Sequence, residues 1–398
     1  MAIDIYEIED LIDDETSYNI QELFSDLLDT RYQPNVRYPL NEIFFLVLCA
    51  QLCGYESFRE YEAYGHLKLS FLRRFIPYEN GIPSHKTIRS ILAIFCPSQL
   101  EDKFRETIKL ITGKRVTLEE SQQPETIAID GKRHRGLKSK GEDSNILHTV
   151  SAYSTKEGVL LGQSTVADKS NEITAIPELL DALEISGQIV TIDAMGCQAE
   201  IAKKIRTKGA DYILALKGNQ GYLYDAVQDF FNNSKNSDSW YSFETENKGH
   251  GRKEKRQCMV VGNLEIPEVY KKWEGLTSII KLISTRELKD KKESEERYYI
   301  SSLDPDPKKI LTSIRRHWGV ENEVHWYLDV VFREDDRIIW NKNIASNEST
   351  IRRLAMSLLK KHKAQSESSG KKKIAMKTLR KNLVADDHSM EIIIRLVV

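Results

Sequence analysis

Two kinds of hydrophobic pattern follow each other in the first half of the chain. From residue 19 to about 115, apolar side chains such as Ile43, Val47 and Leu48 recur at three- and four-residue spacing, which predicts helices. From about residue 125 the pattern changes to short β-prone runs at 126–130, 146–154 and 158–166, with turn residues between the last two. The sequence therefore predicts an all-helical N-terminal domain followed by strands.

Helical and β-prone segments then alternate. We expect a helix near 174–185, a strand at 188–193, a helix at 198–207, a strand at 211–216 and a helix near 220–231. Such alternation is typical of parallel strands with helices packed on the sheet. Three strands followed by this alternation is the order of a ribonuclease-H-like fold, an α/β class in which helices flank a mixed sheet.

The second half of the chain interrupts this order. Residues 235–300 contain polar loops and β-prone segments, which predict a β-rich insertion, and the helical pattern returns from Pro307. Gln365–Gly370 resembles a flexible linker and precedes a Lys-rich end. The expected division is a helical domain over 1–118, a ribonuclease-H-like domain over 119–365 that contains the insertion, and a basic tail over 366–398.

Composition narrows the class of protein. A chain of 398 residues predicts two or three domains. The net charge of -2 conceals an uneven distribution of charge along the chain. Residues 1–30 carry ten acidic and no basic side chains, whereas 351–380 carry ten basic ones and the single acid Glu367.

Three further features of the sequence bear on where the protein acts. The five cysteines form no C-x-x-C pair, no apolar run is long enough to span a membrane, and the acidic N-terminus lacks a signal-peptide pattern. We expect a cytoplasmic protein.

Three acidic residues are the candidate catalytic and metal-binding groups. Asp130 and Asp193 each end an apolar β run, and the C-terminal ends of parallel strands meet at one edge of a sheet. Glu321 lies on a predicted helix. Two divalent ions held by carboxylates can activate a water or a 3′-hydroxyl for attack on a phosphodiester, and Mg²⁺, or Mn²⁺ as a substitute, accepts such oxygen ligands. Taken singly, Asp130 or Asp193 is more often a turn former or a helix cap, and exposed helical glutamates such as Glu321 are common.

Basic and aromatic side chains near these acids give further hypotheses. A helix face shared by His317, Glu321 and His325 suggests zinc, but the H-E-x-x-H pattern is absent, so this hypothesis is disfavoured. Trp318 and Trp326 are interpreted as core aromatics. Basic residues near the acids or in the insertion are candidates for DNA phosphate contacts, although solvated loops explain several of them equally well. The candidates are Lys132, Arg133, Lys217, His250, Arg252, Arg316, His317 and His325.

Seven phrases together carry a resemblance over almost the whole chain. They are Arg37-Tyr-Pro-Leu, Asn80-Gly-Ile-Pro-Ser-His85, Ala128-Ile-Asp-Gly-Lys132, Asp193-Ala-Met-Gly-Cys-Gln198, Ala215-Leu-Lys-Gly-Asn-Gln220, Gly249-His-Gly-Arg252 and Arg316-His-Trp-Gly-Val-Glu-Asn-Glu-Val-His-Trp326. With these phrases the chain resembles the DDE transposases of bacterial insertion sequences, specifically the H-repeat-associated group.

The resemblance implies an Asp-Asp-Glu triad at Asp130, Asp193 and Glu321, with a β insertion before the glutamate. It also implies Mg²⁺-dependent DNA cleavage and strand transfer at insertion-sequence ends. The implied partners are double-stranded DNA, as terminal inverted repeats and target, and a second copy of the chain on that DNA. A related signature with Tyr, Arg and Lys around the glutamate is not met, because Ile314, His317 and Leu328 occupy those positions. Two alternatives stay open: an inactive transposase-derived DNA-binding protein, and a metal-dependent nuclease without strand transfer.

Overall fold

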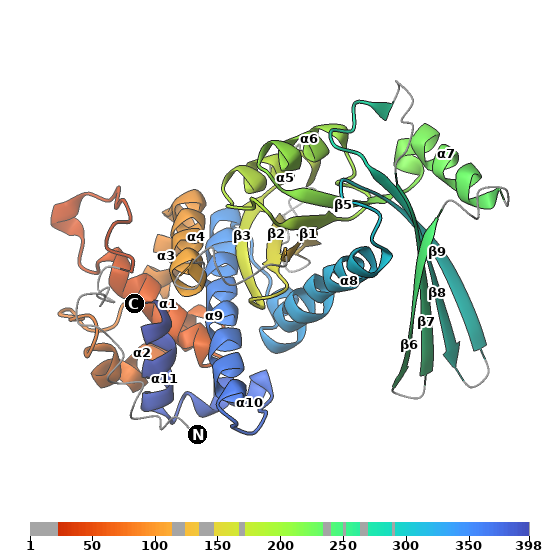
Figure 1. Ribbon diagram of the computed structural model, residues 1–398. Helices are drawn as coiled ribbons and strands as arrows, with labels where there is room; N and C mark the ends of the chain where they lie inside the picture. Colours follow the sequence, from red (N-terminus) through yellow and green to blue (C-terminus); the bar gives the residue numbers. More distant parts are fainter. Residues whose placement is uncertain are drawn as a thin grey trace.

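The computed structural model (Figure 1) describes residues 23–113, 124–134, 147–166, 172–233, 240–249, 252–262, 270–288 and 291–397. The N-terminal module contains α1 (Leu40–Leu52), α2 (Phe58–Leu72), α3 (His85–Ile94) and α4 (Pro97–Gly113), with a 3-10 turn at Gln33–Asn35 before them. Helix α2 begins with a capping box, in which Ser57 accepts from the backbone of Glu60 and the Glu60 side chain accepts from Ser57. Nearly every side chain of α1 is buried, so this helix forms the centre of the module.

The C-terminal helices complete this module instead of extending away as a tail. They are α9 (Lys342–Ser368), α10 (Met376–Asn382) and α11 (Asp387–Ile394), with a final 3-10 turn at Arg395–Val397. Figure 1 shows α11 beside the N-terminal helices and α10 next to the end of α9. The expected linker lies mostly within α9. The expected tail is helical because Leu379, Met390 and Ile393, spaced among its charges, are buried in the same core as α1.

The central sheet has the predicted ribonuclease-H-like order. Its strands are β1 (Thr126–Arg133), β2 (His148–Ser154), β3 (Val159–Thr165), β4 (Ile189–Ile192) and β5 (Asp211–Leu216). They lie in the order β3-β2-β1-β4-β5, with β1 antiparallel to β2 and parallel to β4, and β4 parallel to β5. The fold class predicted from the sequence is therefore confirmed.

Helices cover both faces of this sheet (Figure 1). Helices α5 (Glu172–Asp181) and α6 (Ala199–Thr207) lie on one face and α8 (Pro307–His317) on the other, while α7 (Gly221–Asn232) follows β5 and a 3-10 turn at Gly218–Gln220. Alternation along the strands sets the two faces. Val190 and Ile192 pack with the α5 and α6 side chains, whereas Ile189 packs with Ile310 and Ile314 of α8.

The β-rich insertion extends the same sheet. Its strands are β6 (Tyr241–Gly249), β7 (Arg252–Val261), β8 (Ser278–Leu288) and β9 (Lys291–Ser301). Strand β9 pairs antiparallel with β5, which gives the continuous nine-strand order β3-β2-β1-β4-β5-β9-β8-β7-β6. In Figure 1 the far ends of these four strands project away from the helices. The insertion therefore forms an arm next to the edge of the central sheet.

After α8 the chain continues in wider turns. Two π-helical segments, Val320–His325 and Tyr327–Val331, are followed by a 3-10 turn at Glu334–Asp336 that leads to α9. Such turns occur often at functional sites. Within the described ranges, no helix combines the length and apolar character that a membrane span requires.

Candidate active site

Asp130, Asp193 and Glu321 line one pocket of about 410 Å³. Asp130 lies on β1 and Asp193 directly follows β4, the parallel neighbour of β1. Ile127 and Ile129 pack toward α5 and α6, so the alternation of the strand turns Asp130 to the face covered by α8. Asp130 lies inside β1 and not at its end, but it directly follows the part of β1 that pairs with β4, so it lies next to Asp193 as expected.

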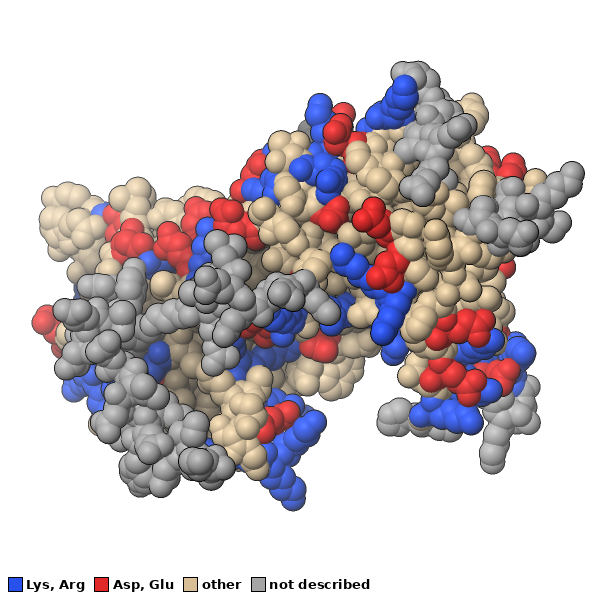
Figure 2. All heavy atoms as spheres, in the orientation of Figure 1, with Lys and Arg blue, Asp and Glu red and all other residues tan. Residues whose placement is uncertain are grey.

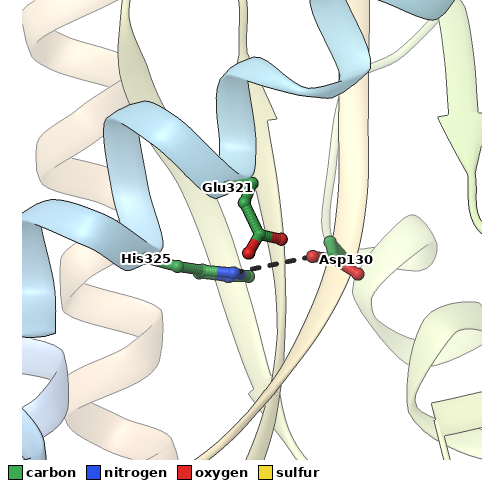
Figure 3. A group of neighbouring side chains, drawn as sticks. All are labelled: Asp130, Glu321 and His325. Carbon is green, nitrogen blue, oxygen red and sulfur yellow. Dashed lines mark ion pairs between the residues drawn. The ribbon is translucent and has the colours of Figure 1, made fainter. Parts of the chain in front are cut away.

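Glu321 reaches the pocket from the π-helical segment after α8. Helix α8 contacts β1 and β4, so its continuation passes the ends of both strands. Figure 3 shows the side chains of Glu321 and His325 pointing toward Asp130. One potential ligand atom from each of these three residues lies within 4.8 Å of the other two.

Burial and neighbouring negative charges disfavour the charged forms of Asp130 and Asp193. Burial, followed by the charge of Asp193, raises the pKa of Asp130 to about 7. Burial also raises the pKa of Asp193, although its Oδ1 accepts hydrogen bonds from the backbone N–H groups of Met195 at 3.1 Å and Gly196 at 3.3 Å. In the described part of the chain, no Lys or Arg forms an ion pair with any of the three carboxylates. The charge of Lys217, which lines the pocket, lowers the pKa of Asp193 but does not outweigh the effect of burial.

A fourth carboxylate, Glu172, lies beside the pocket and was missed by the sequence reasoning. It is buried at the start of α5, and its charge contributes to the raised pKa values of Asp130 and Asp193. Its Oε1 is 2.6 Å from His148 Nε2 on β2. A Cβ added to Gly131 would lie 2.1 Å from the same carboxylate oxygen. Its only sequence signal was an acid at a helix start, which is common without function.

Lys132, a candidate for phosphate contact, lies behind the pocket. It is 7% exposed, pairs with Asp329 and lies 3.5 Å from Glu334. Glu334 also pairs with Arg352 at 3.2 Å and Arg353 at 2.9 Å, all three being buried. This buried cluster connects β1, the π-helical segments and α9. Lys132 is thus placed to hold these elements together rather than to reach a phosphate.

The remaining basic candidates fall into different environments. Arg133, Lys217 and Arg316 are exposed, and Lys217 also lines the pocket. Arg252 is exposed on β7 and pairs with Glu254 at 2.9 Å, whereas His250 lies outside the described residues. On the face seen in Figure 2, basic and acidic side chains intermingle over the projecting strands of the insertion. The insertion surface is therefore largely neutralised by its own ion pairs.

The two histidines next to Glu321 are largely buried. Burial lowers the pKa of His317 and of His325 to about 4, so both rings are neutral at physiological pH. His317 Nδ1 is 3.0 Å from the Thr191 hydroxyl of β4. His325 Nδ1 is 3.6 Å from Asp130 Oδ2. Ile314 and Leu328, at two positions of the unmet signature, are buried and apolar.

The interpretation of two tryptophans as core residues was wrong. Trp318 is 41% exposed and Trp326 is 51% exposed. The inner side of this segment is already filled by Val320, Val324 and Leu328, so the tryptophans face outward. Trp318 lines the pocket, and the Arg297 guanidinium stands 4.6 Å from the centre of its ring.

The fold and the acidic pocket define a class, that of ribonuclease-H-like α/β proteins with carboxylates gathered beside two neighbouring parallel strands. A family model described as "Transposase DDE domain" matches residues 121–358, and one described as "DDE_Tnp_1-associated" matches residues 21–107. The chain belongs to the DDE transposase family.

Similar proteins carry corresponding names. The chain is 40% identical to the "Putative transposase YncI" of Escherichia coli O157:H7 over 342 residues, which cover 83% of this chain and 85% of that protein. It is 38% identical to the "H repeat-associated putative transposase YhhI" of Escherichia coli K12, over 85% of this chain and 90% of that protein. A solved piggyBac transposase synaptic complex with hairpin DNA overlaps with a TM-score of 0.44 and 11% identity, covering 91% of this chain and 75% of that one.

Proposed function

We propose that this protein cleaves DNA at the ends of an insertion sequence and transfers the cut strands to target DNA, with Asp130, Asp193 and Glu321 as its catalytic residues. The observation that carries the proposal is the convergence of these three carboxylates, from distant parts of the chain, on one pocket. Family membership supports the reaction class.

The donor atoms of the pocket suit a divalent cation. Hard cations prefer carboxylate oxygens, and a pocket with a raised Asp130 pKa and no paired Lys or Arg among the described residues gains most from a bound positive charge. Asp130, Asp193 and Glu321 would hold Mg²⁺, or Mn²⁺ in its place. When bound, such ions activate a water or 3′-hydroxyl and stabilise the leaving oxygen.

The protein's own contribution is positioning. Backbone N–H groups of Met195 and Gly196 orient the Asp193 carboxylate, and the strand fixes Asp130. Lys217 lines the pocket and Arg316 is exposed on α8, and in this proposal both bind phosphates of the DNA near the reacting one. Holding reactants in this way accounts for a large part of the rate in such reactions.

The helical module would recognise the DNA ends, and two copies would bring two ends together. This role rests on the position of the module in the chain and on the family. Helix α3 presents Lys86 and Arg89 to solvent. Replacing both with Ala should weaken binding to terminal-repeat DNA without changing Mn²⁺ binding at the pocket. If the variant binds terminal-repeat DNA as tightly as the wild type, α3 does not recognise the DNA ends.

The main test compares the wild type with Asp193→Asn on terminal-repeat DNA in Mg²⁺ or Mn²⁺. Nicking and joining by the wild type, lost in the variant, support the proposal. An exposed carboxylate on α7, Asp225, provides the matched control, and Asp225→Asn should retain activity. Binding without cleavage by the wild type would indicate an inactive DNA-binding protein. Cleavage of any DNA without joining would indicate a nuclease.

A further inference from the structure

We propose that His325 is a metal ligand beside Asp130 and Glu321, so that one ion of the site has both nitrogen and oxygen donors and Mn²⁺ or Co²⁺ is preferred over Mg²⁺. The inference rests on the proposed metal-dependent function and specifies which residues complete its site. It replaces the expectation that His325 faces a DNA phosphate.

The distances fit ligands of one ion. Among the described residues, Asp130, Glu321 and His325 form the group whose donor atoms all lie within 4.8 Å of one another (Figure 3). Ligands bonded at about 2.0–2.1 Å to an octahedral ion lie roughly 3 to 4 Å apart. His325 Nδ1 is 3.6 Å from Asp130 Oδ2, which is longer than a normal hydrogen bond and within that range. Small side-chain adjustments would bring all three to one ion.

The two ring nitrogens of His325 lie in different surroundings. Its Nε2 is buried and accepts or donates no hydrogen bond within the part of the chain that the structure describes. Its side chain is 12% exposed. The other ring nitrogen, Nδ1, lies 3.6 Å from Asp130 Oδ2, so Nδ1 is the atom that the proposal assigns to the ion. Because Nε2 has no hydrogen-bond partner among the described residues, no described group holds the ring through its far side.

The local backbone holds His325 and Glu321 together. Both belong to the π-helical segment Val320–His325, in which residues four apart lie close on one side. The buried side chains of Val320 and Val324 fix the opposite side in the core. Lys132 of β1 pairs with Asp329 in the next π-helical segment, which ties this region to the strand that carries Asp130. The pair of donors is therefore rigidly placed.

Nearby His317 provides a contrast. It lines the same pocket, but its Nδ1 is 3.0 Å from the Thr191 hydroxyl, and it lies outside the group of mutually close donors. We assign it a role in positioning α8 on β4. The two histidines, eight residues apart on one helical stretch, make a matched pair for experiment.

The chemical consequence concerns metal preference. Carboxylate and water ligands suit Mg²⁺, whereas imidazole suits first-row transition ions. Replacing His325 with Gln should weaken Mn²⁺ binding about tenfold or more and weaken Mg²⁺ binding less. The ratio of the Mn²⁺ affinity to the Mg²⁺ affinity should therefore be lower in His325→Gln than in the wild type. In His317→Gln this ratio should be unchanged.

The direct test uses the full chain with bound Mn²⁺ and electron spin-echo envelope modulation, which detects nitrogen bonded to the ion. The wild type should show an imidazole nitrogen signal that changes when histidine is supplied as ¹⁵N-histidine. The signal should be absent in His325→Gln and present in His317→Gln, with thermal melts to verify folding. Mn²⁺ bound without a nitrogen signal in the wild type, or a signal that survives in folded His325→Gln, would overturn the proposal. A wild type that binds Mn²⁺ without a nitrogen signal overturns the proposal even if a variant fails to fold.

Failure of this inference is distinguishable from failure of the proposed function. If Asp193→Asn abolishes cleavage while the Mn²⁺ spectrum lacks nitrogen, the protein is a transposase whose ions have oxygen ligands only. If the wild type binds no Mn²⁺ and cuts no terminal-repeat DNA, both proposals fall.

Discussion

Lys132 of β1 pairs with Asp329 of the second π-helical segment and so joins the strand that carries Asp130 to the helical stretch that carries Glu321. The two residues are far apart in sequence, and the lysine lies two positions after the candidate catalytic aspartate. Because Lys132 also lies near the buried carboxylate of Glu334, it balances negative charge at the back of the site. Lys132 thus supports the two elements that carry Asp130 and Glu321, although its side chain does not line the pocket.

Lys132→Ala should lower the free energy of unfolding by about 1 to 3 kcal/mol, since it leaves Glu334 with fewer partners. Arg133, the next residue on β1, is exposed and serves as the control. Arg133→Ala should leave stability unchanged within about 0.5 kcal/mol. Urea denaturation measures both. Equal stability of the two variants would show that the buried pair is dispensable.

The Asp130 carboxyl should make the metal-free protein less stable at high pH. Its pKa of about 7 in the folded state lies above the ordinary value of 3.8, so the folded state retains a proton that the unfolded state releases, and the stability contributed by this group is lost as pH rises through 7. Asp130→Asn lacks this penalty. In EDTA, the stability gain of Asp130→Asn should be larger at pH 8 than at pH 5 by on the order of 2 kcal/mol.

Comparison of the variant with the wild type at each pH cancels the effect of other titrating groups. The exposed Asp225 is again the control, and Asp225→Asn should show no such pH-dependent gain. A gain for Asp130→Asn that is the same at both pH values would contradict the raised pKa.

Gly131→Ala should disturb the site through Glu172. A Cβ at this position would lie 2.1 Å from the Glu172 carboxylate, whereas one at Gly218 would meet nothing within 4 Å. We expect Gly131→Ala to destabilise the protein by about 1 to 3 kcal/mol and to lower DNA cleavage, and Gly218→Ala to do neither. The double variant Gly131→Ala, Glu172→Ala should recover stability, because the carboxylate no longer occupies the space. Differential scanning calorimetry measures the stability of each variant. A double variant that is no more stable than Gly131→Ala would argue against this contact.

Lys217 should contribute more to DNA affinity than Arg252. Lys217 is exposed at the pocket and forms no ion pair with a described carboxylate, whereas Arg252 is paired with Glu254. Lys217→Ala should reduce the slope of log affinity against log salt by about one, as expected for a lost phosphate contact. Arg252→Ala should change the slope less. Fluorescence anisotropy over a salt series measures both, and the reverse order would place the DNA on the insertion arm.

Much of the fold follows from local pattern. The alternation of apolar runs after residue 125 was enough to predict the ribonuclease-H-like succession of strands and helices along the chain, because strand and helix periods differ and parallel strands require crossovers. The position of Asp130 and Asp193 at one sheet edge followed from the same rule. The tail was mispredicted because the buried positions of α10 and α11 stand among many lysines, and their partners lie in the N-terminal helices.

The sequence by itself determined that Asp130 and Asp193 follow apolar β runs and that a β-rich segment separates them from Glu321. Only the tertiary structure decided that Lys132 faces inward, that Glu172 lies against Gly131, and that His325 stands beside Asp130. These relations depend on the side of a strand or helix that a neighbouring element covers. That choice is made by packing between segments far apart in the chain, which local periodicity does not encode.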